Sequence, residues 1–338
     1  MVEEVPKPTA WLPPSGGSQA LRIVYFGTPA FAVPSLVALA HSRHQVVALV
    51  SQPDRPRGRG QRIQVTPTKE AALARGIPVL QPERIKDPEL LERIKTLGAD
   101  LGVVAAYGRI IPDALLNAPR LGMVNVHASL LPKYRGAAPV HRAVIAGERE
   151  TGVTIMRLVT ELDAGPTFAM RRRAIGEDET STEVEHALAA LGADLLMEAV
   201  DEIAAGRAVE TPQDDSQASF APKLTKAEGQ VDWRLPARVL HNRIRGLQPW
   251  PLASVRLADQ RILLHRSRLV SSAVPGATGG RSEPGTIIVA DANGIIATCG
   301  DGFPLQILQL QPEGSRVMSA REYLAGHRVS AGARFETS

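Results

Sequence analysis

Residues 22–27, RIVYFG, form a short apolar run that ends in glycine. Its β-branched and aromatic residues predict a buried β-strand. Two later runs, Gln45–Val50 and Leu101–Ala106, are apolar without alternation, as expected of strands covered on both faces of a parallel sheet. Met123–His127 predicts a further strand. Because helical patterns separate these runs, the first half of the chain predicts a doubly wound, mostly parallel α/β sheet.

Helical patterns lie between and after the predicted strands. Periodic apolar residues predict helices near Lys69–Arg75 and Pro88–Thr96. A long helix is predicted after residue 177, where Thr180 and Glu183 have the spacing of a capping box. Gly206 follows the last apolar residue of its stripe and is expected to end this helix.

The pattern changes after the long helix. Glu210–Ser219 is polar and contains Pro212, which predicts a linker. Ala237–Arg245 predicts a helix. Short alternating runs then predict strands at Ala253–Leu257, Ile262–Leu269, Gly285–Val289, Gly294–Thr298 and Leu305–Leu310. Short strands separated by turns predict a small β-barrel of the OB type.

Composition limits the class of protein. A chain of 338 residues suits two domains, and 44% hydrophobic and 22% charged residues are ordinary for a globular protein. The net charge of +4 comes from residues 211–338, which hold 15 basic and 11 acidic residues and are compatible with a polyanionic partner. The single cysteine, Cys299, excludes an internal disulfide and a multi-cysteine metal site, and favours a reducing, cytoplasmic setting. No apolar run approaches the roughly 20 residues that span a bilayer.

Two polar residues lie at the end of the strand predicted at Met123–His127. Residues i and i+2 of a strand point to the same side, so Asn125 and His127 project together. They lie at the carboxyl end of the strand, where open α/β sheets bind ligands. Asparagine donates without changing charge, and histidine can donate, accept or carry a proton near neutral pH. The pair suits acyl transfer, although two hydrogen-bonded polar residues at a strand end would give the same pattern.

Two other features are less specific. Asp163 follows the strand predicted at Val153–Val159, in a turn-like sequence, and its spacing alone does not pair it with His127. The first predicted strand runs into Gly27–Pro29, a candidate glycine-rich phosphate loop. The G-x-G-x-x-G spacing is absent, and Pro29 lacks a backbone N–H that could bind phosphate. A dinucleotide site is therefore excluded. No His, Asp or Glu cluster has the spacing of metal ligands.

The run from Asn125 to Pro139, NVHASLLPKYRGAAP, resembles the folate-site signature of the 10-formyltetrahydrofolate-dependent formyltransferases. The resemblance implies that Asn125, His127 and Asp163 are the catalytic residues. It also implies that 10-formyltetrahydrofolate is the co-substrate and that the chemistry requires no metal. The implied folate-binding residues are Ser129, Leu130, Leu131, Pro132, Tyr107, Gly108, Ile110 and Ile111.

Three further features resemble the family members that formylate methionyl initiator tRNA. These are the loop Gln52–Gly60 (QPDRPRGRG), the run Arg135–Pro139, and a C-terminal domain with Lys223–Lys226 and Gln248–Pro251. The family uses such a loop as a wedge against the acceptor end of tRNA, and the residue that carries over is Arg59. Arginine forks on a glycine-rich loop also suit phosphate. Further candidates for tRNA binding are Arg55, Lys223, Lys226, Arg243 and Arg245.

These features predict a chain of four parts. They are a mobile N-terminal extension over residues 1–20, a formyltransferase catalytic domain over 21–206, a linker over 207–221 and a C-terminal β-barrel tRNA-binding domain over 222–338. We expect a cytoplasmic monomer that binds initiator methionyl-tRNA and the folate co-substrate but no membrane. Phe31 is expected to line the pocket for the methionine side chain.

Three other functions remain open at this point. A formyltransferase acting on an amino sugar or another small amine would share the catalytic residues but would not need the arginine loop. A hydrolase could release formate from the same folate. An RNA-binding module could use the α/β domain only as a scaffold, which would leave Asn125 and His127 unexplained.

Overall fold

The computed structural model describes residues 19–57, 62–270 and 282–337. The chain divides into two compact units, each assembled from several segments. The first unit takes residues up to 135, 152–172 and 186–219, and the second takes residues 136–151, 173–185 and those from 220 onward. The predicted domains are continuous in sequence, whereas these units interleave, so the division at residues 206 and 222 stays a prediction.

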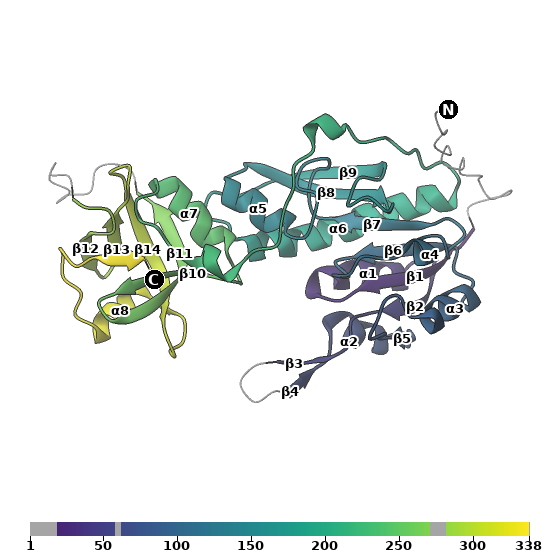
Figure 1. Ribbon diagram of the computed structural model, residues 1–338, viewed down its shortest axis with the longest axis horizontal. Helices are drawn as coiled ribbons and strands as arrows, with labels where there is room; N and C mark the ends of the chain where they lie inside the picture. Colours follow the sequence, from purple (N-terminus) through teal and green to yellow (C-terminus); the bar gives the residue numbers. More distant parts are fainter. Residues whose placement is uncertain (1–18, 58–61, 271–281, 338) are drawn as a thin grey trace, which may run out of the picture. The chain divides into compact units, whose positions relative to one another are not determined.

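A seven-stranded sheet forms the centre of the first unit, with the strand order β5-β2-β1-β6-β7-β8-β9 (Figure 1). The strands are β1 (Arg22–Gly27), β2 (Gln45–Val50), β5 (Val79–Leu80), β6 (Leu101–Ala105), β7 (Met123–His127), β8 (Glu150–Arg157) and β9 (Thr167–Ala174). All pairs from β5 to β7 are parallel, and β8 pairs antiparallel with β7. The predicted doubly wound, mostly parallel α/β fold is therefore confirmed.

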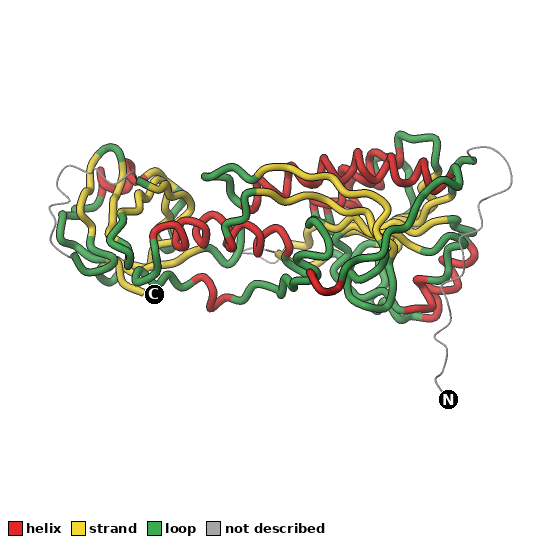
Figure 2. The backbone as a smooth tube through the Cα atoms, turned by 90° about the horizontal axis from the view of Figure 1, so that it is seen from above, coloured by secondary structure: helices red, strands yellow, loops and turns green. Residues whose placement is uncertain are grey.

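Helices lie on both sides of these strands (Figure 2). They are the 3-10 turn η1 (Ala30–Ala32) and the helices α1 (Val33–Ala40), α2 (Pro67–Leu73), α3 (Pro88–Thr96), α4 (Asp113–Leu116) and α6 (Ser181–Ala204). Because both faces are covered, β6 is buried along its whole length and β1 at every residue after Arg22. The carboxyl ends of β1, β6 and β7 consequently meet at one edge of a rigid, buried sheet.

The long helix α6 begins as the sequence predicts. The Thr180 amide donates to Glu183 Oε2 at 2.8 Å, and the Glu183 amide donates to Thr180 Oγ1 at 3.3 Å. This reciprocal pair satisfies two of the amide groups that the first turn of a helix leaves without partners. The helix ends at Ala204, two residues before Gly206, which has a positive φ of 72°.

An antiparallel sheet forms the second unit, in the order β12-β13-β14-β11-β10-β16 with β15 beside β14. The strands are β10 (Ala253–Leu257), β11 (Gln260–Leu269), β12 (Ile287–Asp291), β13 (Gly294–Thr298), β14 (Pro304–Pro312), β15 (Met318–Ser319) and β16 (Phe335–Thr337). A bridge between Thr286 and Arg334 joins the two outer strands of this order, so the sheet curls back on itself. The predicted small β-barrel is confirmed.

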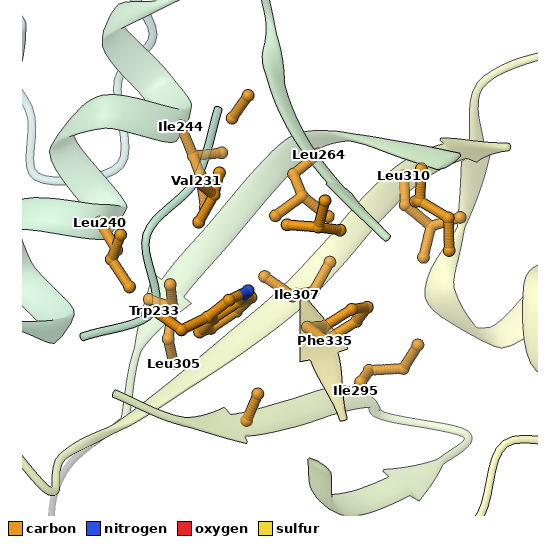
Figure 3. Packing of buried hydrophobic residues seen from close by; sticks show 14 of the residues in the cluster. Val231, Trp233, Leu240, Ile244, Leu264, Ile295, Leu305, Ile307, Leu310 and Phe335 are labelled. Carbon is orange, nitrogen blue, oxygen red and sulfur yellow. The ribbon is translucent and has the colours of Figure 1, made fainter. Parts of the chain in front are cut away.

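Buried aromatic and aliphatic side chains fill this curled sheet. Figure 3 shows Trp233 beside Phe335, and their rings stack at 5.2 Å with an angle of 7° between the planes. Leu264, Ile295 and Ile307 are fully buried around them. The unit is completed by the helices α5 (Pro139–Ala146), α7 (Ala237–Gly246) and α8 (Ala320–Gly326) and the 3-10 turn η3 (Lys226–Gly229).

Several elements were not predicted. The strands β3 (Arg55–Arg57) and β4 (Arg62–Gln64) pair antiparallel, and we call this pair the β3–β4 hairpin. The helices α5 and α8 and the strand β9 also went unpredicted. Across the described residues, none of the helices combines the length and apolar character that crossing a bilayer would take.

Candidate active site

The last residue of β7, His127, is held through one of its two ring nitrogens. Its side chain is only 5% exposed, and Nε2 lies 3.0 Å from the carbonyl oxygen of Tyr134. Because a carbonyl oxygen can only accept, Nε2 carries a hydrogen and donates it. In the neutral ring, Nδ1 therefore keeps its lone pair. That lone pair makes Nδ1 the proton-accepting atom of this site.

The carboxylate of Asp163 lies opposite Nδ1, as the resemblance implied. Its Oδ2 atom is 3.7 Å from Nδ1, and the Asp163 side chain is 12% exposed. This separation is too long for a direct hydrogen bond. Asp163 itself has a left-handed backbone with φ of 50°. The turn that carries it is therefore locally strained.

Asn125 lies two residues before His127 on the same strand and on the same side of the sheet. Its backbone pairs with Val104 of β6 and Met156 of β8, which holds the strand from both sides. The side chain is half-buried. Among the described residues, none is hydrogen-bonded to its amide group. The amide is therefore available to donate to an acceptor that is not part of the protein.

The loop after β7 is a compact turn attached to β8. Ser129 is buried, and its hydroxyl donates to the carbonyl of Lys133 at 2.6 Å. Thr154 of β8 donates to the Ser129 carbonyl and accepts from the amide of Leu131, which is also buried. Leu130 and Pro132 are half-buried. Ser129 and Leu131 thus hold the shape of the predicted folate loop, while Leu130 and Pro132 have surface to offer a ligand.

The second predicted folate loop follows β6. The carbonyl of Tyr107 accepts from Gln52 Nε2 at 2.7 Å, and the Tyr107 ring is buried against Phe26. Within the described part of the chain, the amide groups of residues 108–111 donate to no backbone carbonyl. Ile110 is 83% exposed, whereas Ile111 is buried. Free backbone donors beside apolar side chains fit the edge of a flat heterocycle such as a pterin.

A closed polar network lies at the base of the β3–β4 hairpin. Lys69 Nζ is 2.6 Å from Asp54 Oδ2 and 2.7 Å from Gln81 Oε1. Gln81 in turn donates to Asp54 Oδ1 and to the Gln52 carbonyl, both at 2.9 Å. Hydrogen bonds from Lys69 and Gln81 hold the pKa of the Asp54 carboxyl below its ordinary value of 3.8. The residue before the hairpin is thereby fixed to α2 and to the sheet edge.

The predicted tRNA-binding residues differ in their surroundings. Arg59 lies outside the described residues. Arg55, in the first unit, and Lys223 and Lys226, in the second, are exposed. Arg243 is half-buried and donates to the Glu228 carbonyl at 2.7 Å.

Arg245 does not fit its predicted role as a phosphate contact. It is only 6% exposed. Its guanidinium donates to the Asn242 side chain and to the carbonyls of Gly176 and Glu179. A buried arginine needs hydrogen-bond partners, and Arg245 finds them within the second unit. The sequence of α7 is rich in arginines and gives no sign that Arg245 is buried.

Phe31, the expected wall of a methionine pocket, is 7% exposed in η1. Its role in a methionine pocket stays a prediction. In the portion of the chain that the structure describes, no group of three or more His, Cys, Asp or Glu side chains could hold a metal ion.

Sequence reasoning missed two residues that adjoin the His127–Asp163 pair. Gln213 belongs to the segment interpreted as a linker, yet its amide donates to the carbonyls of Asp163 and Gly165. Arg135 was part of the quoted motif but had no role, and its buried guanidinium donates to Gln213 Oε1. A glutamine after Pro212 in a polar stretch carries no signal of such a contact, because 50 residues separate it from Asp163.

Known proteins resemble both parts of the chain. The model of the formyl transferase family matches residues 21–200, and that of its C-terminal domain matches residues 223–328. A methionyl-tRNA formyltransferase of Heliobacterium modesticaldum is 46% identical over 317 residues, covering 93% of this chain and 100% of the relative.

Solved structures share the fold at low identity. An N-formyltransferase of Helicobacter canadensis, in complex with folinic acid and dTDP-3-aminofucose, has a TM-score of 0.64 at 16% identity and covers 85% of this chain and 98% of its own. A variant of HypX from Aquifex aeolicus also has a TM-score of 0.64 at 16% identity. That match covers 92% of this chain but only 49% of HypX.

Proposed function

The chain belongs to the formyl transferase family, and from that premise we propose that it formylates the α-amine of methionyl initiator tRNA. The formyl donor is 10-formyltetrahydrofolate. The observation that carries the acceptor is the 46% identity to a methionyl-tRNA formyltransferase along 93% of this chain. That match extends through the C-terminal domain, which the family model places at residues 223–328.

Asn125, His127 and Asp163 are the proposed catalytic residues. The acceptor amine forms a bond to the formyl carbon, which develops negative charge on the formyl oxygen. The bond from that carbon to N10 of the folate then breaks, and the proton that the amine loses balances the one that the departing N10 gains. The available amide of Asn125 is suited to donate to that oxygen. His127, once protonated, supplies a second donor with full positive charge.

The 3.7 Å separation between His127 Nδ1 and Asp163 Oδ2 supports a role for the pair in proton transfer. Nε2 is committed to the Tyr134 carbonyl, so a proton gained by His127 must go to Nδ1. At 3.7 Å, the Asp163 carboxylate stabilises that proton, and a water molecule or an amine could bridge the two groups. Asp163 is thus proposed to orient His127, to stabilise its protonated form and to assist removal of the proton from the amine.

The folate is proposed to bind between the two loops that flank these residues. Support comes from the free amide groups of residues 108–111 and from the half-buried Leu130 and Pro132. Such donors can hold the heterocycle while apolar side chains cover its faces. The folate supplies the formyl group, and the protein supplies binding, orientation and charge stabilisation.

The tRNA is proposed to contact Arg59, Arg55, Lys223, Lys226 and Arg243. The exposed cations among them can neutralise phosphates, which gives an affinity that falls steeply with salt. Arg245 is left out because its guanidinium is already satisfied within the second unit. We further propose that the protein acts as a monomer in the cytoplasm, where charged initiator tRNA is made and used.

A single assay tests the proposal against its alternatives. The protein is incubated with 10-formyltetrahydrofolate and, in separate reactions, with charged initiator methionyl-tRNA, charged elongator methionyl-tRNA and a small amino sugar. We expect N-formylmethionine to appear on initiator tRNA far faster than on either other acceptor. Formylation of the amino sugar alone would make the small-amine alternative correct, and formate released without any acceptor would indicate a hydrolase.

A further inference from the structure

The segment Gln213–Ser219 contacts both loops that hold the catalytic histidine. At one end, Gln213 Nε2 donates to the carbonyls of Asp163 at 2.8 Å and Gly165 at 2.7 Å. At the other end, the Ser219 hydroxyl accepts from the amide of Tyr134 and the Ser219 carbonyl accepts from the amide of Arg135. A stretch whose composition predicts a linker therefore lies against the active site within the first unit.

The orientation of the Gln213 amide is determined by its neighbours. Arg135 donates to Oε1 from Nε at 3.1 Å and from Nη2 at 2.7 Å, and a guanidinium can only donate. The nitrogen end must therefore face the two carbonyls, where only a donor fits. Arg135 is itself anchored, because its Nη2 atom also bonds Asp215 at 2.6 Å. Gln213 is consequently held in a single orientation by a buried charge.

The turn that Gln213 supports requires such support. Asp163 has a left-handed backbone, which is costly for any residue other than glycine. Gly165 lies so close to β8 that an added Cβ atom would be 2.0 Å from the Arg157 carbonyl. The turn is thus pressed against β8 on one side and hydrogen-bonded to Gln213 through two carbonyls. Loss of these bonds would let Asp163 relax away from His127.

Both partners of the His127 ring connect to the same pair of residues. The Tyr134 carbonyl, which accepts from Nε2, is directly bonded to the nitrogen of Arg135. The Asp163 carboxylate, which faces Nδ1, is on the residue whose carbonyl Gln213 holds. One Arg135–Gln213 interaction therefore spans the two supports of the imidazole.

We propose that Gln213, oriented by Arg135, is a positioning residue that sets the separation between His127 and the Asp163 carboxylate. The proposal rests on the proposed function, since it concerns the proton-handling step of formyl transfer. Gln213 acts through Asp163 and touches no reacting atom. Displacement of a catalytic group by about 1 Å can lower a rate on the order of 100-fold, so small changes in this turn are sufficient.

The central experiment compares Gln213→Ala with Gln217→Ala. Gln217 is an exposed glutamine of the same segment, and its amide bonds Asp214 rather than the catalytic loops. We expect Gln213→Ala to lower kcat by about 10- to 100-fold with KM for both substrates within about twofold. Gln217→Ala should match the wild type. Equal kcat values for the two variants would overturn the proposal.

A double-mutant cycle separates positioning from a general structural role. In an Asp163→Asn background, Gln213→Ala should cost less than about threefold, because the group that it positions is already disabled. A full, multiplicative loss in that background would show that Gln213 acts elsewhere and would contradict the inference. The pH dependence of kcat should also shift in Gln213→Ala, whereas loss of folded protein would scale the whole profile without moving it.

A second variant keeps the test decisive if Gln213→Ala fails to fold. Gln213→Glu keeps the acceptor for Arg135 but removes both donors to the turn, so the segment stays anchored. It should fold and show the same loss in kcat; wild-type activity in this variant would refute the inference.

The controls also separate this inference from the proposed function. A wild-type protein that does not formylate methionyl-tRNA refutes the proposed function. An active wild type with an impaired Asp163→Asn variant and an unimpaired Gln213→Ala variant refutes only the positioning role.

Discussion

Two polar networks at the carboxyl edge of the same sheet differ in how completely they are closed. At the base of the β3–β4 hairpin, Lys69 and Gln81 bond the Asp54 carboxylate at 2.6 Å and 2.9 Å. At the end of β7, His127 and Asp163 face each other at 3.7 Å. Both are largely withdrawn from solvent, and both join residues far apart in sequence.

The difference indicates which network stabilises the fold and which performs chemistry. The bonds of Asp54 are short and charge-assisted, so this network contributes stability. The longer separation of His127 and Asp163 leaves a lone pair on Nδ1 and room for a proton or a bridging atom. Catalytic contacts are often long without substrate and tighten when it binds. Four predictions test this contrast.

The largest expected effect is at the proposed catalytic residues at the end of β7. Asn125→Ala removes the proposed donor to the formyl oxygen, which typically costs about 2.7–4 kcal/mol of barrier, or roughly 100- to 1,000-fold in kcat. KM should change little, because the donor acts mainly in the transition state. Initial rates over a range of folate and methionyl-tRNA concentrations measure both constants.

An exposed asparagine provides the control for Asn125. Asn117 follows α4, and its side chain donates to the Asp113 carbonyl rather than to any proposed catalytic residue. Asn117→Ala should keep the wild-type kcat. If Asn125→Ala kept it as well, the oxyanion role would have to be abandoned.

The second effect concerns the hairpin that the closed network supports. Arg59→Ala should lower kcat/KM for methionyl-tRNA by about tenfold, or about 1.4 kcal/mol, while KM for folate stays unchanged. The logarithmic salt slope of tRNA binding should also fall by about one. Arg75→Ala, which alters an exposed arginine after α2, is the matched control. An Arg59→Ala variant with unchanged turnover at limiting tRNA would remove the wedge role.

The third effect should fall on stability rather than on chemistry. Asp54→Asn removes the charge from the closed network and should lower the free energy of unfolding by about 1–2 kcal/mol at pH 7. Its kcat should stay within about twofold of the wild type. Urea unfolding followed by circular dichroism measures the first quantity. Glu83→Gln, at an exposed pair with Arg55 at 3.5 Å, should cost less than about 0.5 kcal/mol.

The smallest effect is the pH dependence of that stability. Bonds from Lys69 and Gln81 lower the folded pKa of Asp54 below 3.8, so its contribution is present above about pH 4 and is lost as the pH falls through the folded value. The difference in unfolding free energy between wild type and Asp54→Asn should therefore shrink below pH 4. A difference that stayed constant down to pH 2 would mean that the Asp54 charge contributes nothing.

Predictions of secondary structure succeeded where apolar residues are dense. The runs at β1, β2 and β6 were correct because burial on both faces requires continuous apolar sequence. The strand β9 was missed because its sequence, TFAMRRRA, carries arginines on a half-exposed surface. The helix α5 was missed because it begins directly after the motif, where the loop pattern hides its proline start.

The residues of the candidate site likewise include some that the sequence identified and some that it did not. Strand periodicity alone indicated that Asn125 and His127 share one side of the sheet, and the motif's resemblance to a family added Asp163. Neither could identify Gln213, since a polar residue in a polar stretch has no periodicity to reveal its partner. Arg245 was misjudged for the converse reason, because its charge indicated a surface that burial in the second unit removes.

The sequence by itself determined which residues form the sheet and which chemical groups stand at its edge, because these depend on local spacing and residue type. Only the tertiary structure decided how those groups are held. The 3.7 Å separation of His127 and Asp163, and the support of both their loops by the Gln213–Ser219 segment, arise from contacts between residues 36 to 85 positions apart. Local propensity contains no information about such distances, because they are set by how the chain packs against itself.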